Sequence, residues 1–378
     1  MISMFSNHFF NWTEQLRDSG HEIYWIDVFD SNTYVEKIDF VHQIIGWRNR
    51  VDYPGRYWVK NNLPEINHFL NYFNQRELSD FVDQKIQEFK PDVVQSFVLY
   101  SAAYPILSIM KNYPQIKWIY SAWGNDLFFR QQQEDELDKI KTSLPNFDYM
   151  FADCNRDGQL AVKLGFQGKY LGTFPGGGGY DLDYFHKYCT PIHDRDIILV
   201  KGYQGKLGRA IYIIKSIIAL KKELSNYRVI IFGCDNELEE MLEGEKGNWP
   251  NIEILKKISH EEVMKLMGQA KIYIGNCISD GMPNTLLEAI VMGAFPIQSN
   301  PGGATAEIIQ HAKNGYLIKN PEDEQEIKFH IQNALTKTGF LEVAVAYNNE
   351  NVRPKLEREY IKEQVLKKYT IVENELKI

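Results

Sequence analysis

The second half of the chain alternates short β-rich runs with helical patterns, and this alternation limits the fold more than any other feature of the sequence. The β-rich runs lie at 196–202, 227–233, 251–255, 271–275, 294–299 and 314–318. The helical patterns lie near 208–224, 235–244, 259–269, 283–292, 303–311 and 322–336. Strands that alternate with helices in this way predict a parallel sheet covered by helices on both faces.

The first half of the chain repeats the pattern less regularly. Strand-like runs are MISMFS, HEIYWIDVF, PDVVQSFV, IKWIYSAW and FDYMFADC, and helices are expected near 8–19, 64–89, 101–112, 130–142 and 155–164. Residues 31–62 fit neither period and predict an irregular insertion with room for one edge strand. A chain of 378 residues is too long for one ordinary core, so we expect two Rossmann-like domains.

A run of four glycines, residues 176–179, separates the two halves. Such a run forms neither a helix nor a stable strand, so it predicts a linker, a hinge beside a ligand, or both. We expect a first domain at 1–185 and a second domain at 186–345. A charged amphipathic helix within 346–378 is expected to cross back to the first domain.

Composition excludes several classes of protein. The net charge of −8 argues against nucleic acid as a main partner. No run approaches 18 consecutive apolar residues, and no basic segment precedes an apolar one at the start, so neither a membrane span nor a signal peptide is expected. The four cysteines match no common zinc spacing and indicate free thiols in a reducing cytosol. These features predict a cytoplasmic protein.

One stretch, SDGMPNTLLEAIVMGAFPIQSNPGGATAEII at 279–309, places two carboxylates around the start of a helix. Pro283 suits the first turn of that helix, and apolar residues then recur at helical spacing. The strand at 271–275 ends just before it, at the sheet edge where parallel sheets bind ligands. A helix start favours phosphate, and Asp280 and Glu288 suit hydroxyl groups. The stretch therefore predicts a nucleotide-sugar site, although acidic residues near helix starts are also stabilising by themselves.

The string DGMPNTLLEAI at 280–290 is followed by GAFPI at 293–297, then by Pro301, Gly302, Gly303 and Glu307. Together these residues resemble the donor-site signature of the family 4 retaining glycosyltransferases. The resemblance implies the GT-B fold, in which two Rossmann-like domains with parallel sheets face each other across a cleft. That family usually has E-x7-E, and this chain has the shorter aspartate at the first position.

The resemblance also implies roles for individual residues. Glu288 is expected to bind the donor ribose, and Asp280 to face O3 and O4 of the transferred sugar. Sugar hydroxyls and the distal phosphate are expected at the backbone of Met282, Pro283, Asn284, Thr285 and Leu286.

The segment KGYQGKLGRA, residues 201–210, stands where the family carries a basic pair that offsets the leaving diphosphate. The candidates are Lys206 and Arg209, with Lys201 and Gly202 further back. Arg209 is favoured because a guanidinium binds phosphate bidentately, and a solvated loop is the alternative. The nucleobase is expected near residues 255–262, with Ile258 among its contacts.

In the first domain, SAWGNDLFF at 121–129 resembles the family's H-G-x-D stretch, with Trp123 where histidine is usual. Asn125 and Asp126 are candidates for sugar or acceptor binding, or alternatively for capping a helix. His8 follows the first strand and is a candidate for the same site, with a structural role as the alternative.

Residues 47–60 interleave aromatic and basic side chains: Trp47, Arg48, Arg50, Tyr53, Arg56, Tyr57, Trp58 and Lys60. Such a segment suits stacking on sugar rings, binding of an anionic lipid-linked acceptor, or contact with the inner face of the cell membrane. An exposed, solvated edge is the alternative.

The resemblance implies transfer of a sugar, with retention, from a UDP- or GDP-sugar to a hydroxyl of a glycan or lipid-linked saccharide, as in polysaccharide biosynthesis. UDP is the favoured nucleotide, and neither a metal nor a cofactor is expected. The alternatives are a nucleotide-sugar 2-epimerase and a non-catalytic nucleotide-sugar-binding protein. The oligomeric state is left open.

Overall fold

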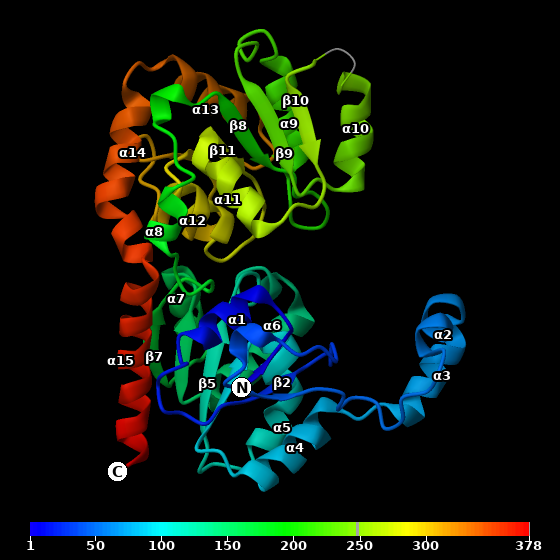
Figure 1. The fold of residues 1–378 in the computed structure, drawn as a ribbon. Coiled ribbons are helices and arrows are strands. Elements are labelled where there is room, and N and C mark those ends of the chain that lie inside the picture. Colours follow the sequence, from blue (N-terminus) through cyan, green and yellow to red (C-terminus); the bar gives the residue numbers. More distant parts are fainter. Residues whose placement is uncertain (247–248, 378) are drawn as a thin grey trace. The chain divides into compact units, whose positions relative to one another are not determined.

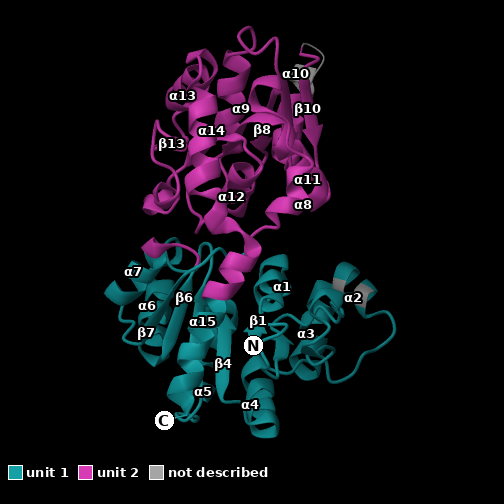
Figure 2. Ribbon diagram, turned by 60° about the vertical axis from the view of Figure 1, so that its left-hand side comes forward, with its two compact units in different colours: residues 1–152, 157–177, 365–378 teal, residues 153–156, 178–364 magenta. Residues whose placement is uncertain are grey.

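The computed structural model describes residues 1–246 and 249–377. The chain forms two compact units, coloured separately in Figure 2. Unit 1 comprises residues 1–152, 157–177 and 365–378, and unit 2 comprises residues 153–156 and 178–364. The main passage between the units, from Gly177 to Gly178, falls inside the run of four glycines. No helix among the described residues is long and apolar enough to cross a membrane.

Unit 1 is built on a seven-stranded parallel sheet (Figure 1) with the strand order β3-β2-β1-β4-β5-β6-β7. Its strands are β1 (Ile2–Ser3), β2 (Tyr24–Asp27), β3 (His42–Ile44), β4 (Val93–Phe97), β5 (Lys117–Ala122), β6 (Tyr149–Ala152) and β7 (Lys169–Thr173). Its helices are α1 (Asn7–Glu14), α2 (Arg56–Asn62), α3 (Pro64–Asn74), α4 (Leu78–Phe89), α5 (Leu107–Met110), α6 (Glu134–Ser143) and most of α7 (Asn155–Lys163). The predicted edge strand of the irregular insertion is β3.

Unit 2 is built on a six-stranded parallel sheet with the order β10-β9-β8-β11-β12-β13. Its strands are β8 (Ile197–Lys201), β9 (Arg228–Phe232), β10 (Ile252–Leu255), β11 (Ala270–Gly275), β12 (Phe295–Ser299) and β13 (Tyr316–Ile318). Its helices are α8 (Leu182–His186), α9 (Ala210–Ala219), α10 (Asn236–Lys246), α11 (His260–Gln269), α12 (Asn284–Val291), α13 (Glu324–Thr336) and α14 (Phe340–Asn351). The long helix α15 (Arg358–Leu376) begins in unit 2 and ends in unit 1.

The prediction of two parallel α/β domains is confirmed, and all six predicted strands of the second half are present. The helix predicted at 303–311 is wrong. Only a single turn forms there, because Gly302 and Gly303 have φ values of 62° and 92° and the side chain of Asn314 then binds the backbone of Ile308 and Gln310. The helix predicted at 64–89 is two helices, and α14 and β7 were not predicted.

The end of α15 is tied to the sheet of unit 1 by a buried hydroxyl. Tyr369 Oη accepts a hydrogen bond from Trp12 Nε1 at 3.0 Å and donates one to Gln95 Oε1 at 2.6 Å. We expect Tyr369→Phe to lower the free energy of unfolding by about 1–3 kcal/mol, because both partners lose a hydrogen bond in a buried site.

Urea unfolding followed by tryptophan fluorescence measures this loss. Tyr360→Phe is the matched control, since Tyr360 lies exposed on the same helix. Equal unfolding free energies for the two variants would contradict the structural role of Tyr369.

Candidate functional site

Two loops at the carboxyl edge of the unit 2 sheet lie side by side. The first follows β8 and covers residues 202–209, and the second follows β11 and covers 276–283. Gly208 and Cys277 form an antiparallel bridge between the loops. Arg209 N donates to Asn276 O at 3.1 Å, and Ile278 N donates to Leu207 O at 2.9 Å. The structure thus brings the predicted basic segment to the predicted start of the acidic one.

Asp280 lies half-buried in the second loop, and its Oδ1 accepts a hydrogen bond from Gly281 N at 2.9 Å. Burial raises the pKa of Cys277 to about 11, the Asp280 charge adds to the rise, and Lys201 opposes it. Burial also raises the pKa of Tyr203, again with a contribution from Asp280. Asp280, Lys201 and Tyr203 lie at or just after the carboxyl ends of β8 and β11, which are neighbours in the sheet.

Glu288 lies in the second turn of α12 with 7% of its surface exposed. Its Oε1 is 2.7 Å from Nε2 of His260, the first residue of α11. A buried carboxylate with one hydrogen-bonding neighbour retains acceptor positions for ligand hydroxyls. His260 was not predicted, although it follows Ile258 by two residues in the segment expected to lie near the nucleobase.

The start of α12 differs in detail from the prediction. Pro283 is the N-cap residue rather than part of the first turn, and no side chain caps the helix. Leu286 N donates to Pro283 O at 3.0 Å, and proline has no N–H, so neither residue offers an amide to a ligand. Of the predicted set, Met282 and Thr285 are the residues that we consider as backbone amide donors to a ligand.

The side chains around this helix start are fixed by packing. Leu286 is fully buried, and Met282 is nearly so. Tyr273 Oη donates to Thr285 Oγ1 at 2.8 Å, and Tyr180 Oη donates to Asn284 O at 3.3 Å. The helix start is therefore held in one position before any ligand arrives.

Arg209 is the N-cap residue of α9, and its guanidinium is held by two acceptors. Nε donates to Glu322 Oε1 at 2.6 Å, and Nη1 donates to Gly208 O at 2.7 Å. Within the described part of the chain Nη2 has no hydrogen-bond partner, and it is the group left for an anion. Lys206 lies exposed in the same loop, and Lys201 lies half-buried at the end of β8.

Gly202 and Ile258 occupy the neighbouring loops. A Cβ atom on Gly202 would lie 2.9 Å from Cys234 Cα, so only glycine fits there. Ile258 is half-buried against the core of unit 2. Close by in sequence, Lys256 pairs with Glu239 at 2.6 Å.

In unit 1, the predicted residues gather near the carboxyl ends of β1 and β5. His8 is exposed at the start of α1, and its ring lies 6.4 Å from that of Trp123. Asn125 is half-buried, and among the described residues its Oδ1 has no hydrogen-bond partner. Asp126 is buried, and its Oδ2 accepts hydrogen bonds from Leu99 N at 2.6 Å and from Tyr120 Oη. These contacts give Asp126 a role within the fold of unit 1.

Asp126 also predicts a pH dependence of stability. Burial raises its pKa to about 7, although the hydrogen bonds from Tyr120 and Leu99 lower it. The unfolded carboxyl ionises near pH 3.9, so between about pH 4 and 7 the unfolded state releases a proton that the folded state keeps. Rising pH then favours unfolding, by at most about 1.4 kcal/mol per pH unit in this window.

The measurement is the free energy of unfolding of the wild type and of Asp126→Asn between about pH 4 and 7. We expect the wild type to lose stability relative to the variant as the pH rises. Tryptophan fluorescence suits this purpose, because six of the seven tryptophans lie in unit 1. If the free energies of unfolding of the two proteins changed in parallel over this pH range, the Asp126 carboxyl would be ionised in the folded state.

The segment of interleaved aromatic and basic residues at 47–60 has a buried part and an exposed part. Trp47 is buried and stacks on Phe81 with ring centroids 4.7 Å apart. Arg48 donates from Nη1 to Val28 O at 3.3 Å, whereas Trp58 lies exposed on α2. The side chains of Tyr57 and Lys60 lie outside the described part of the structure.

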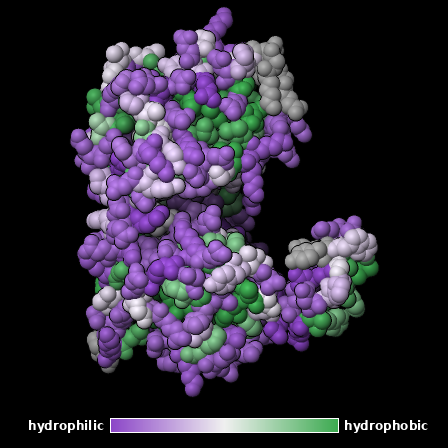
Figure 3. All heavy atoms as spheres, viewed as in Figure 1, coloured by the Kyte–Doolittle hydropathy of each residue, from purple (hydrophilic) through white to green (hydrophobic). Residues whose placement is uncertain are grey.

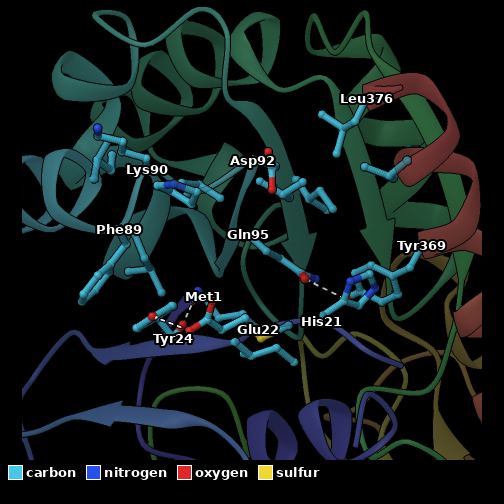
Figure 4. A pocket seen from close by; sticks show the side chains of 18 of the residues that line it. Met1, His21, Glu22, Tyr24, Phe89, Lys90, Asp92, Gln95, Tyr369 and Leu376 are labelled. Atoms are coloured by element: carbon cyan, nitrogen blue, oxygen red, sulfur yellow. Dashed lines mark hydrogen bonds between the residues drawn. The ribbon is translucent and has the colours of Figure 1, made fainter. Parts of the chain in front are cut away.

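A cavity of about 540 Å³ lies in unit 1, at the amino ends of β1, β2 and β4 (Figure 4). It is lined by Tyr24, Phe89, Asp92 and Gln95, and by Tyr369 and Leu376 from α15. Parallel sheets bind ligands at their carboxyl edge, and this cavity lies at the opposite edge of its sheet. It is therefore separate from the candidate site described above.

Residues 191–351, which lie within unit 2, match the family model described as "Glycosyl transferases group 1". This part of the chain is therefore similar in sequence to group 1 glycosyltransferases. It covers less than half of the chain and includes both loops of the candidate site. It also contains Arg209, Asp280 and Glu288.

A curated relative of the chain is the GtfA subunit of UDP-N-acetylglucosamine–peptide N-acetylglucosaminyltransferase from Streptococcus pneumoniae serotype 4. The two sequences are 27% identical over 115 residues, which are 30% of this chain. The aligned part is 23% of the relative, so the match spans less than a quarter of that protein's length.

Solved glycosyltransferase structures share the fold. Sucrose-phosphate synthase from Thermosynechococcus elongatus aligns with a TM-score of 0.69 at 16% identity, over 98% of each chain. HepE from Anabaena, solved with UDP, gives 0.70 at 11% identity, also over 98% of each chain. Pneumococcal GtfA, solved with UDP and GlcNAc, gives 0.60 at 18% identity, over 79% of this chain and 60% of that one. At these identities the likeness establishes the fold, which is GT-B.

Proposed function

We propose that this protein is a group 1 glycosyltransferase, which transfers a sugar, with retention of configuration, from a UDP-sugar to a hydroxyl group of a glycan or lipid-linked saccharide. The observation that carries the proposal is the pairing of the loop at 202–209 with the loop at 276–283, beside an uncapped helix start. This pairing places cationic, acidic and amide groups at one sheet edge. The cationic and amide groups suit the diphosphate of a nucleotide-sugar, and the acidic groups suit the hydroxyls of its sugar and its ribose.

Glu288 and Asp280 are the proposed hydroxyl-binding groups. Glu288 accepts hydrogen bonds from the ribose, and His260 holds its carboxylate from the other side at 2.7 Å. Asp280 lies half-buried in the loop before α12, and it accepts hydrogen bonds from the transferred sugar. Hydrogen bonds to a carboxylate are roughly twice as strong as neutral ones, so these two residues would supply much of the donor affinity.

The departing diphosphate is the proposed ligand of Arg209 Nη2, Lys206 and the amides of Met282 and Thr285. In the reaction the bond from the anomeric carbon to the phosphate oxygen breaks, and a bond to the acceptor oxygen forms on the same face. The acceptor's proton passes to the departing phosphate oxygen, so no protein nucleophile takes part. The protein acts by positioning the donor and by stabilising the negative charge that develops on the diphosphate.

The proposed reaction takes place in the cytoplasm without a resident metal or cofactor. All four cysteines are free thiols, as a reducing compartment favours. Each role proposed above belongs to a side chain or a backbone amide of the chain, and none is assigned to a metal or a cofactor. The proposal predicts that activity persists in the presence of a metal chelator.

The test is a nuclear magnetic resonance assay of the purified chain with a panel of UDP-sugars and saccharide acceptors, in the presence of a chelator. A new glycoside whose anomeric configuration equals that of the donor is the expected product. A glycoside of inverted configuration would overturn the retaining mechanism. An epimerised donor, or binding without any product, would replace the transferase with an epimerase or with a non-catalytic binding protein.

A further inference from the structure

Unit 1 carries a helical arm, residues 51–74, that includes α2 and α3 (Figure 1). The two helices pack chiefly against each other. At the root of the arm Asn49 and Gln75 form an antiparallel bridge, and Arg50 N donates to Asn74 O at 2.8 Å. The Asn74 side chain also exchanges two hydrogen bonds of 2.8 Å with the backbone of Val51.

The root is anchored to the core of unit 1. Trp47, just before the root, is buried against Phe81, and its Nε1 donates to Asp27 O at 2.8 Å. Arg76, just after the root, donates from its backbone N to Arg48 O at 2.8 Å. Such a root holds the arm as an ordered projection of unit 1 rather than as a loose loop.

The arm exposes a large apolar face. No residue of α3 is buried, and Ile66, Phe69 and Phe73 recur at the spacing of one helix face. Phe69 is 64% exposed, Phe73 is 63% exposed, and Trp58 on α2 is 61% exposed. Figure 3 shows apolar side chains gathered on the surface of the arm. A face of this kind marks a contact with a partner or a membrane.

The charge of the arm and its root indicates whether this face contacts a partner or a membrane. Residues 47–76 contain five basic residues, Arg48, Arg50, Arg56, Lys60 and Arg76, against the two acids Asp52 and Glu65. Within the arm, Arg56 and Lys60 are balanced by Asp52 and Glu65. The net charge of +3 therefore comes from the three arginines at the root, whereas the whole chain has −8, which leaves −11 on the remainder. Basic residues beside exposed tryptophan, phenylalanine and tyrosine are the composition of segments that lie in the interface of an anionic bilayer.

We propose that the arm inserts its apolar face, Trp58, Ile66, Phe69, Tyr72 and Phe73, into the interface of an anionic lipid bilayer. A bilayer suits this face better than a second copy of the chain, because tryptophan and tyrosine beside basic residues are typical of bilayer interfaces. The proposal rests on unit 1 alone and does not depend on the proposed function of unit 2.

The test is co-sedimentation of the full chain with vesicles made of equal parts of phosphatidylglycerol and phosphatidylcholine. We expect the chain to bind these vesicles, to bind pure phosphatidylcholine weakly, and to be released by high salt, which screens the basic residues. The double variant Phe69→Asp, Phe73→Asp should lower the partition coefficient at least about tenfold, because it removes two aromatic rings from the interface.

Phe329→Asp is the matched control, because Phe329 is 61% exposed on α13 of unit 2. It should bind vesicles like the wild type. The double variant should keep the melting temperature of the wild type, since neither side chain belongs to a core. Equal sedimentation of the double variant and the wild type, or no binding by the wild type at low salt, would overturn the proposal. A wild-type dimer that the double variant converts to a monomer would assign the face to a second copy instead.

Discussion

Replacement of Glu288 by alanine is expected to weaken UDP binding about 100-fold. The carboxylate is proposed to accept two hydrogen bonds from the ribose, and hydrogen bonds to charged groups contribute about 1.5–3 kcal/mol each. A loss of about 3 kcal/mol corresponds to roughly 100-fold in affinity. Calorimetric titration of UDP into the two proteins measures the change, and the kcat/KM for the donor should fall by at least the same factor.

Glu288→Gln separates the charge from the volume of this side chain. It keeps the packing of the buried site and removes the charge, so we expect it to lose most of the affinity that alanine loses. The control is Glu253→Ala, since Glu253 lies on β10 and its side chain is 49% exposed. If Glu253→Ala weakened UDP binding as much as Glu288→Ala, the ribose would not be bound by Glu288.

Arg209→Ala is expected to lower kcat about 100- to 1000-fold, the usual cost of removing one group that stabilises transition-state charge. The KM for the donor should change less, because the negative charge on the diphosphate grows as the sugar leaves. Arg209→Lys should recover only part of the rate, because a lysine cannot keep the Glu322 and Gly208 contacts while it binds phosphate. Steady-state kinetics of both variants with the preferred donor provide the measurement.

Arg228→Ala is the matched control for Arg209, since Arg228 lies exposed on β9 and pairs with Glu253 at 3.3 Å. It should leave kcat unchanged. An Arg209→Ala variant that raises the KM of the donor without lowering kcat would show that Arg209 binds donor and transition state equally. The diphosphate would then be stabilised by other groups.

Much of unit 2 was predictable because its strands are short, apolar and separated by clear helical patterns. Leu286, Leu287, Ile290 and Val291 are all buried, as their helical spacing predicts. The sequence also predicted that Asp280 precedes a helix and that Glu288 lies within it, and the structure has both at these places. What the sequence did not show was the pairing of the loop at 202–209 with the loop at 276–283, because hydrogen bonds between backbones carry no residue signature.

The residue that was not predicted and the two helices that were predicted wrongly also have physical reasons. No feature of the sequence linked His260 to Glu288, and the packing of α11 against α12 brings the two residues together. The helix expected at 303–311 failed because two glycines with positive φ preceded it. The periodic pattern at 64–89 extended across a break at Gln75, where the chain returns to its root beside Asn49.

The thermal stability of the chain with UDP, GDP, ADP or CDP, each in excess and with a metal chelator, tests the proposed donor site most directly. A ligand at about 100 times its dissociation constant adds about 2.7 kcal/mol of stability. We expect a clear rise in melting temperature with UDP that Glu288→Ala abolishes. An unchanged melting temperature with every nucleotide, or a rise that Glu288→Ala leaves intact, would contradict the assignment of the donor site.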